Sequence, residues 1–128
     1  MSALIIWMDT VEAKLFEIEK DSIKAERVLF HGPTHQKEVM GKNHNRNDSD
    51  EEVFYIQLLE KLKTKDAKQI LLMGPSLGAT HFNTFLARTA TEIFQRVIGT
   101  EKVDRMPDSE ILSVGRKHLQ KYYLYHAV

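Results

Sequence analysis

The chain has 128 residues, and its 18 lysines and arginines balance 18 aspartates and glutamates. This length suits a single domain with a substantial core, since chains of this size bury about two thirds of their unfolded surface. The balanced charge excludes binding to nucleic acid or membranes by bulk charge alone. The absence of cysteine excludes a disulfide framework, a thiolate metal site and a cysteine nucleophile.

The first predicted elements are two antiparallel strands, residues 3–9 and 11–19. The first is nearly all apolar, as in a central strand, and the second alternates apolar with charged residues. Asp9-Thr10 is a poor two-residue hairpin turn, so we expect a slightly longer connection. The apolar run 3–8 lacks a preceding basic region and a cleavage site, and it is too short to span a bilayer. We therefore expect a soluble, cytoplasmic protein with no membrane partner.

A third strand is predicted at residues 26–31, followed by an irregular stretch at 33–49 (PTHQKEVMGKNHNRNDS). This stretch has neither helical nor strand periodicity. Loops longer than about 12–15 residues are uncommon in compact domains and are usually functional or disordered. Residues 33–49 are therefore the first place to look for function.

Helical signals resume at Asp50, with Ser49 or Asp50 as the cap. The run 70–73 predicts a buried strand that stops at Gly74-Pro75, and from Leu77 the apolar residues recur at helical spacing up to Phe94, with Ser76 as the cap. A last strand is predicted around 101–103, and Pro107-Asp108 begins a final helix that leads to an aromatic tail at 122–128.

This order of elements predicts an α/β fold of the ribonuclease-H-like type. Three antiparallel strands are followed by two parallel strands in a mixed five-stranded sheet, with helices on both faces. Residues 1–128 are expected to form one domain that carries the polar loop at 33–49.

Several segments together resemble the middle domain of archaeal and eukaryotic class I peptide-chain release factors and of Pelota, and its bacterial relatives, the translational machinery proteins. They are 3–19 (ALIIWMDTVEAKLFEIE), the long polar loop after the third strand, 70–82 (ILLMGPSLGATHF) and 97–119 (VIGTEKVDRMPDSEILSVGRKHL). Their order and spacing carry the resemblance, which covers nearly the whole chain.

In release factors this loop carries Gly-Gly-Gln, which reaches the peptidyl-transferase centre and supports hydrolysis of peptidyl-tRNA. Asn47-Asp48-Ser49 stands where that motif is expected here. Side chains at Asn47 and Asp48 obstruct the close backbone approach that glycines allow, and Asp48 places an anion beside phosphates. The resemblance therefore implies a non-hydrolytic domain, as in Pelota, whose middle domain also lacks the motif and uses basic residues.

We thus expect a domain that acts in or beside translation by binding the ribosome, through ribosomal RNA or tRNA, with no DNA specificity and no cofactor. Cationic side chains pair with phosphates, while amides and imidazoles bond to sugars or bases. The RNA-binding candidates are Lys37, Lys42, Asn43, His44, Asn45 and Arg46. The alternative is a protein-interaction or scaffold domain without RNA contact, which forms a homodimer through its aromatic tail.

A third interpretation is an enzyme, either a peptidyl-tRNA hydrolase or a metal-dependent nuclease. Two-metal chemistry needs carboxylates that converge from several elements. Asp9 is suitably placed and the first helix offers Glu52 or Glu60, but the strand ending at Gly74 supplies no acid. We favour a hairpin-turn role for Asp9 and predict no catalytic residues.

Other patterns are weaker still. His31, His35 and His44 lack the spacing of metal ligands on a helix and have no cysteine to help them, so we predict no metal site. Gly74 and Gly78 are not followed by the lysine of a phosphate-binding loop, and Ser76 lacks the G-x-S-x-G context of a nucleophile. We interpret His81 and His118 as surface or partly buried residues.

Overall fold

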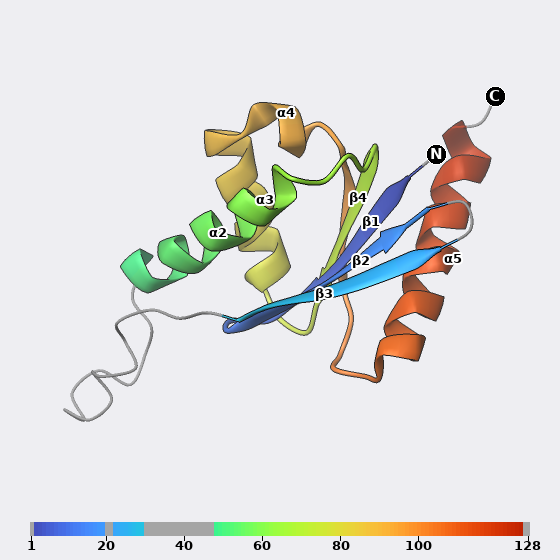
Figure 1. Ribbon diagram of the computed structural model, residues 1–128, viewed down its shortest axis with the longest axis horizontal. Helices are drawn as coiled ribbons and strands as arrows, with labels where there is room; N and C mark the ends of the chain where they lie inside the picture. Colours follow the sequence, from blue (N-terminus) through green and yellow to red (C-terminus); the bar gives the residue numbers. More distant parts are fainter. Residues whose placement is uncertain (1, 20–21, 30–47, 127–128) are drawn as a thin grey trace.

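The computed structural model describes residues 2–19, 22–29 and 48–126 (Figure 1). Strands and helices alternate after an opening run of strands. The elements are β1 (Ala3–Met8), β2 (Glu12–Ile18), β3 (Ile23–Leu29), α2 (Asp48–Leu62), β4 (Gln69–Gly74), α3 (Gly78–Thr89), α4 (Thr91–Phe94), β5 (Val97–Lys102) and α5 (Asp108–His126).

The strands form one sheet in the order β3-β2-β1-β4-β5. β1 pairs antiparallel with β2 and parallel with β4, so that Trp7 lies opposite Lys14 on one side and Met73 on the other. β2 pairs antiparallel with β3, and β4 pairs parallel with β5. The predicted ribonuclease-H-like sheet is confirmed, and the wholly apolar β1 is its central strand because both of its faces are buried.

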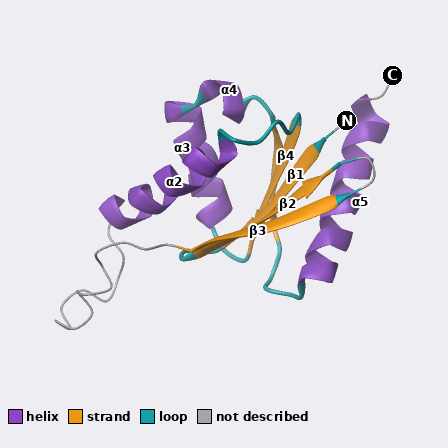
Figure 2. Cartoon of the chain, viewed as in Figure 1, coloured by secondary structure: helices purple, strands orange, loops and turns teal. Residues whose placement is uncertain are grey.

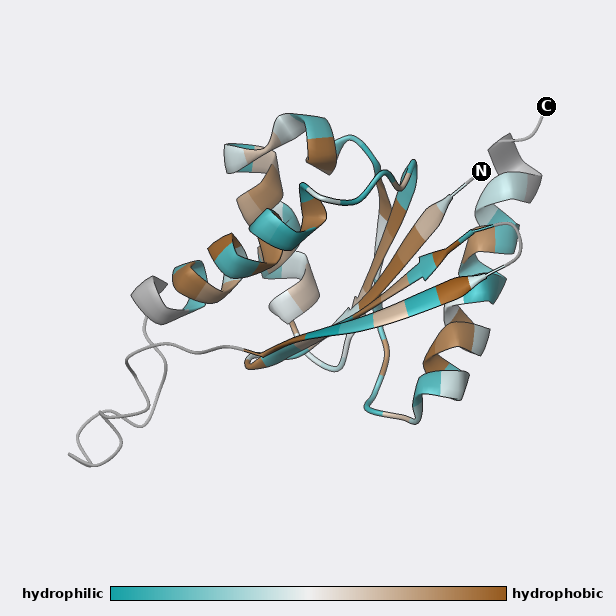
Figure 3. Ribbon diagram, in the orientation of Figure 1, coloured by the Kyte–Doolittle hydropathy of each residue, from teal (hydrophilic) through white to brown (hydrophobic). Residues whose placement is uncertain are grey.

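Helices cover both faces of the sheet, as predicted. α2, α3 and α4 lie on one face and α5 lies on the other (Figures 1 and 2). Alternate residues of β1 point to the two layers: Leu4 and Ile6 pack under α2 and α3, whereas Ile5 and Trp7 pack under α5. The apolar residues along the middle of the sheet mark this two-sided core in Figure 3.

Two glycines allow close packing around β1. A Cβ atom at Gly74 would lie 2.2 Å from the carbonyl oxygen of Met8, and a Cβ atom at Gly115 would lie 2.5 Å from Cδ1 of Ile5. Such distances are far below van der Waals contact. Gly74 lets the end of β4 approach β1, and Gly115 lets α5 settle directly onto the sheet.

The structure corrects several predicted boundaries. β3 begins at Ile23 rather than at residue 26, while the predicted residues 30 and 31 lie outside the described residues, and β5 covers Val97–Lys102 rather than 101–103. β3 is an edge strand with mostly exposed residues, so its first residues, 23–25, show no apolar run from which the start of the strand could be predicted. β5 contains Gly99 and its residues are only partly buried, so its sequence has no clear alternation of apolar and polar residues from which a strand is predicted.

Helix ends also differ from the prediction. The stretch 77–94 is two helices rather than one, because Ala90 has an extended φ of −148° between α3 and α4. Leu77, not Ser76, holds the cap position of α3, and no side chain caps it. α2 begins at Asp48, two residues before the predicted start, and α5 continues through most of the aromatic tail. None of the described helices is long and apolar enough to cross a membrane.

Candidate nucleic-acid interface

The six predicted RNA-binding residues, Lys37, Lys42, Asn43, His44, Asn45 and Arg46, lie outside the described residues. Their place in the fold is set by the two elements that flank them. β3 ends at Leu29 and α2 begins at Asp48. Two positions of the expected loop, Asp48 and Ser49, instead belong to the first turn of α2. The Asn47-Asp48-Ser49 sequence thus runs into a helix.

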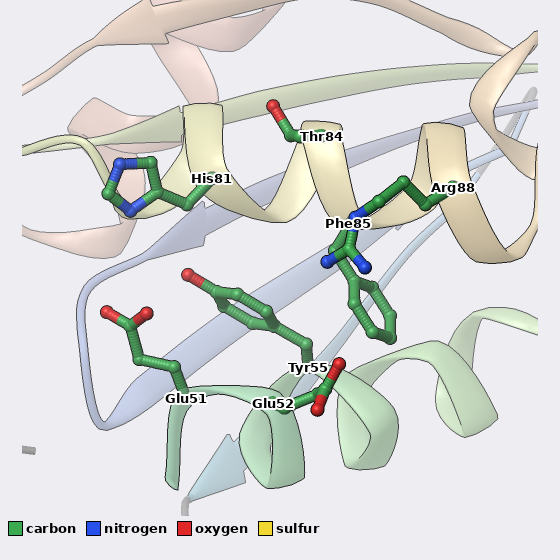
Figure 4. A pocket seen from close by; sticks show the side chains of 7 residues that line it. All are labelled: Glu51, Glu52, Tyr55, His81, Thr84, Phe85 and Arg88. Atoms are coloured by element: carbon green, nitrogen blue, oxygen red, sulfur yellow. The ribbon is translucent and has the colours of Figure 1, made fainter. Parts of the chain in front are cut away.

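A groove of about 310 Å³ lies beside the first turns of α2, between this helix and α3 (Figure 4). α2 contributes Glu51, Glu52 and Tyr55 to its lining. α3 contributes His81, Thr84, Phe85 and Arg88. The two walls come from elements that are separated in the sequence by β4, so the groove is a product of the tertiary fold.

The charges of the groove are divided between its walls. The carboxylate of Glu51 points toward His81 in Figure 4, and that of Glu52 lies on the side of Arg88. The guanidinium of Arg88 lies 6.0 Å from the centroid of the Phe85 ring, within the range of a weak cation–π contact. Arg88 has no ion pair among the described residues and remains available to a phosphate.

Aromatic rings form the base of the groove. The centroid of the Tyr55 ring lies 5.4 Å from that of Phe82 and 5.5 Å from that of Phe85. Tyr55 and Phe85 are buried, so these rings fix the spacing of α2 and α3 rather than offer a stacking surface. The polar rim is therefore the part of the groove that a ligand would contact.

Asp9 is the first residue of the β1–β2 connection, and its side chain stabilises this connection. One of its carboxylate oxygens accepts hydrogen bonds from the backbone N–H groups of Val11 and Glu12, at 2.9 and 2.8 Å. The other oxygen pairs with Arg105. This geometry confirms the hairpin-turn interpretation, and the connection of three residues, 9–11, is longer than two residues, as predicted.

The ion pair of Asp9 belongs to a larger cluster where β1, β2 and the β5–α5 connection meet. Arg105 also approaches Glu12 at 3.6 Å, and Glu12, only 6% exposed, pairs with Arg27 as well. The indole N–H of Trp7 donates to the carbonyl oxygens of Val103 and Asp104 at 3.1 and 3.3 Å. Every carboxylate of the cluster has a cationic partner, which indicates a structural role.

The remaining carboxylate candidates of the nuclease interpretation lie apart from one another, whereas the histidines weighed as metal ligands, His31, His35 and His44, lie outside the described residues. Glu52 lines the groove, while Glu60 is exposed and lies 3.4 Å from Lys63. His118 Nδ1 lies 3.9 Å from Glu101 on the other face of the sheet. Within the part of the chain that the structure describes, no three histidines or carboxylates are grouped as metal ligands.

A charged network fixes the end of α2 against the sheet. Glu26 on β3 lies 2.6 Å from Lys61 and 2.7 Å from Lys65. Hydrogen bonds from these two ammonium groups lower the pKa of Glu26 below its ordinary value of 4.5. The hydrogen bond to Glu26 raises the pKa of Lys65. The orientation of α2, and hence of the groove, depends in part on these pairs.

Known structures share this fold. Pelota from Archaeoglobus fulgidus superposes with a TM-score of 0.65 at 11% identity, over 91% of this chain and 31% of that chain. Pelota from Thermoplasma acidophilum has a TM-score of 0.62 at 21% identity, over 85% of this chain and 30% of that chain. An archaeal translation termination factor has a TM-score of 0.60 at 9% identity, over 98% of this chain and 41% of that chain. This chain therefore has a fold that also occurs in Pelota and in the termination factor.

The likeness lies in the fold, and it extends to only part of each neighbour. The chain spans about a third of the length of the two Pelota proteins and 41% of the termination factor. The sequence matches no family model, and no curated protein is similar to it in sequence.

The sequence alone did not single out Arg88 or Glu51, and it raised Glu52 only as a possible ligand of a nuclease metal. A usable signal was present, since His81, Thr84 and Arg88 follow one another at three- and four-residue steps on one side of α3. The opposing wall of Glu51 and Glu52 could not be read from the sequence, because nothing in a helical pattern states which helix packs beside it.

Proposed function

We propose that this chain is a non-hydrolytic, release-factor-like domain that acts in or beside translation by binding ribosomal RNA or tRNA. The observation that carries the proposal is its fold, which Pelota and an archaeal termination factor share over at least 85% of this chain. The sequence resemblance described above supports it independently, because its segments follow the same order along the chain.

The candidate contacts are the six residues of the 30–47 segment. Lys37, Lys42 and Arg46 pair with phosphates, and Asn43, His44 and Asn45 bond to sugars or bases. Three cationic contacts to a single strand predict a log–log salt dependence with a slope of about −2. Binding by this segment alone is therefore weak and sensitive to salt.

The proposed absence of peptidyl-tRNA hydrolysis follows from the residues that replace the Gly-Gly-Gln motif. Asn47-Asp48-Ser49 supplies neither the two glycines nor the glutamine, and Asp48 and Ser49 are helical in α2. A helical turn with side chains cannot make the close backbone approach that glycines permit. We expect no release of peptide from peptidyl-tRNA.

Co-sedimentation with ribosomes over a series of KCl concentrations tests the proposal. The wild-type chain is expected to sediment with ribosomes at low salt, and a variant with Lys42→Ala and Arg46→Ala to remain in the supernatant. The matched control carries Lys24→Ala and Lys63→Ala, two exposed cations of the folded body, and should sediment like wild type. Equal loss in both variants, or no sedimentation of the wild type, contradicts the proposal.

A protein-interaction domain is the second candidate, and one observation favours it. β3 is an edge strand, and its apolar residues Ile23 and Leu29 are 39% and 43% exposed. Unpaired edges of this kind can pair with another chain. Light scattering that finds a stable dimer, together with no ribosome co-sedimentation, would favour this function over RNA binding.

A further inference from the structure

The solvent-facing side of α5 carries three cations and no anion. Positions 113, 116, 117, 120 and 121 fall on one side of a helix with 3.6 residues per turn, and all five are exposed. Three of them are Arg116, Lys117 and Lys121. The acids of α5 are confined to its start, Asp108 and Glu110, so this side of the helix has no carboxylate of its own.

These cations differ from most of those on the rest of the body. Lys61 and Lys65 are held by Glu26, and Arg105 by Asp9. Arg116, Lys117 and Lys121 have no ion pair with any described residue. Glu101 contacts His118 of α5, which lies outside the arc of the three cations. Their charge is thus directed to solvent.

An apolar hollow of about 270 Å³ adjoins this surface, where α5 crosses the start of β1 and the end of β2. It is lined by Ala3, Ile18, Arg116, Leu119, Gln120 and Tyr123. The hydroxyl of Tyr123 donates to the side-chain oxygen of Gln69 at 3.0 Å. Burial raises the pKa of this phenol, so Tyr123 adds no negative charge to the surface.

Cations beside a partly apolar recess with an aromatic wall match the chemistry of a single nucleic-acid strand. The phosphates of such a strand are bound by cationic side chains. An unstacked base is bound in an apolar site, where it contacts an aromatic ring and an amide group can form hydrogen bonds with its edge. Gln120 supplies such an amide, and Arg116 can contact a phosphate or a base plane. The bases of a double helix are stacked and paired, so they cannot enter the hollow.

We propose that α5 and the adjoining hollow form a second RNA-binding surface, which takes single-stranded RNA with its phosphates on Arg116, Lys117 and Lys121 and a base in the hollow. This inference rests on the proposed RNA-binding function and adds a contact on the opposite face of the sheet from α2. Two separated contacts on one domain raise the effective concentration of RNA at each of them, which offsets the weak binding of the 30–47 segment.

Fluorescence anisotropy with a short labelled polyuridine RNA tests the surface. The first variant carries Arg116→Gln, Lys117→Gln and Lys121→Gln, which keep the helix propensity of α5. It is expected to bind at least about tenfold more weakly at low salt, with a log–log salt slope shallower by about 2. The matched control carries Lys24→Gln, Lys63→Gln and Lys102→Gln, with the same loss of charge away from α5, and should change affinity less than about threefold.

A second pair of variants tests the hollow. Tyr123→Leu removes the ring and is expected to weaken binding by about fivefold or more, in keeping with the loss of one base–aromatic contact. Tyr123→Phe keeps the ring and loses only the bond to Gln69, so RNA affinity should stay within about twofold. Circular dichroism of each variant confirms that the fold is retained.

The same RNA measured with Lys42→Ala plus Arg46→Ala separates this inference from the proposed function. Loss of binding in the loop variant with no change in the α5 variant overturns the inference and leaves the proposed function standing. Loss in the α5 variant supports the inference, whether or not the loop variant also binds more weakly. Equal effects of the α5 variant and its charge control overturn the inference, and a wild-type chain that binds no RNA overturns both.

Discussion

The guanidinium of Arg105 lies 4.8 Å from the centroid of the Trp7 ring and pairs with the carboxylate of Asp9. Trp7 is fully buried in the central strand, and its indole N–H bonds to the backbone of the connection that carries Arg105. These contacts together tie the β1–β2 hairpin to the segment that leads into α5.

Replacement of Arg105 should loosen this junction. Arg105→Met is expected to lower the free energy of unfolding by about 1–2 kcal/mol, because a partly exposed cation–π contact and a paired charge are lost. Arg105→Lys, which keeps the charge, should lose less. Urea denaturation followed by Trp7 fluorescence measures both, since Trp7 is the only tryptophan. An unchanged stability of Arg105→Met would contradict the role of this contact.

We predict that the packing of α5 on β1 requires glycine at position 115. Gly115→Ala gains about 1 kcal/mol of helix propensity, but its methyl group meets the buried Ile5 side chain. We expect a net loss of stability of about 1 kcal/mol from this overpacking. Ile5→Val removes the Cδ1 atom that lies closest, so the double variant should be more stable than the sum of the two single changes predicts.

Gly74→Ala provides the comparison for that experiment. Its methyl group would meet the backbone oxygen of Met8 rather than a side chain. No side-chain change on β1 can relieve such a clash. We expect a larger loss of stability than for Gly115→Ala, measured by the same denaturation, and no rescue by Ile5→Val. Equal losses at the two glycines would show that the approach of β4 to β1 is not tight.

The pair of Glu26 with Lys61 and Lys65 predicts a defined pH dependence. The pKa of Glu26 is lower in the folded chain than its ordinary value of 4.5, so its contribution is complete above pH 4.5 and is lost as the pH falls through the lowered value. Glu26→Gln should destabilise the chain at neutral pH by less than about 1 kcal/mol, as for partly exposed pairs. The difference from wild type should shrink as the solution is acidified.

The pKa of Lys65 is shifted in the opposite direction to that of Glu26, which gives an independent check of the same ion pair. It is raised in the folded chain above its ordinary value of 10.5, so its contribution is complete below pH 10.5 and is lost as the pH rises through the raised value. Lys65→Met should therefore flatten the alkaline limb of the stability curve. A Lys65→Met curve parallel to that of wild type at high pH would contradict the assigned pairing.

The divided charges of the groove predict opposite effects on RNA affinity. Glu51→Gln plus Glu52→Gln removes two anions near the start of α2 and should tighten polyuridine binding, whereas Arg88→Gln should weaken it, each by a few fold. Anisotropy at several KCl concentrations measures both. Effects of the same sign for the two variants would show that RNA does not approach this rim.

The sequence by itself determined the element order and the character of the central strands. β1 and β4 are unbroken apolar runs, and such runs are stable only when both faces of a strand are covered. That requirement fixed a layered α/β fold with helices on each side. The presence of a polar segment between the third strand and the first helix was likewise evident, because it lacks any period, although Asp48 and Ser49 at its predicted end belong to α2.

Tertiary structure decided what local patterns do not encode. β3 and β5 were misplaced because their residues are set by the strands beside them, Ile23 by Ile18 and Thr100 by Leu72, rather than by an apolar period of their own. The groove, the cation of Arg105 over Trp7 and the hollow under α5 each join residues distant in the chain. Such contacts depend on which surfaces pack together, and the free energy of packing belongs to pairs of elements rather than to either sequence alone.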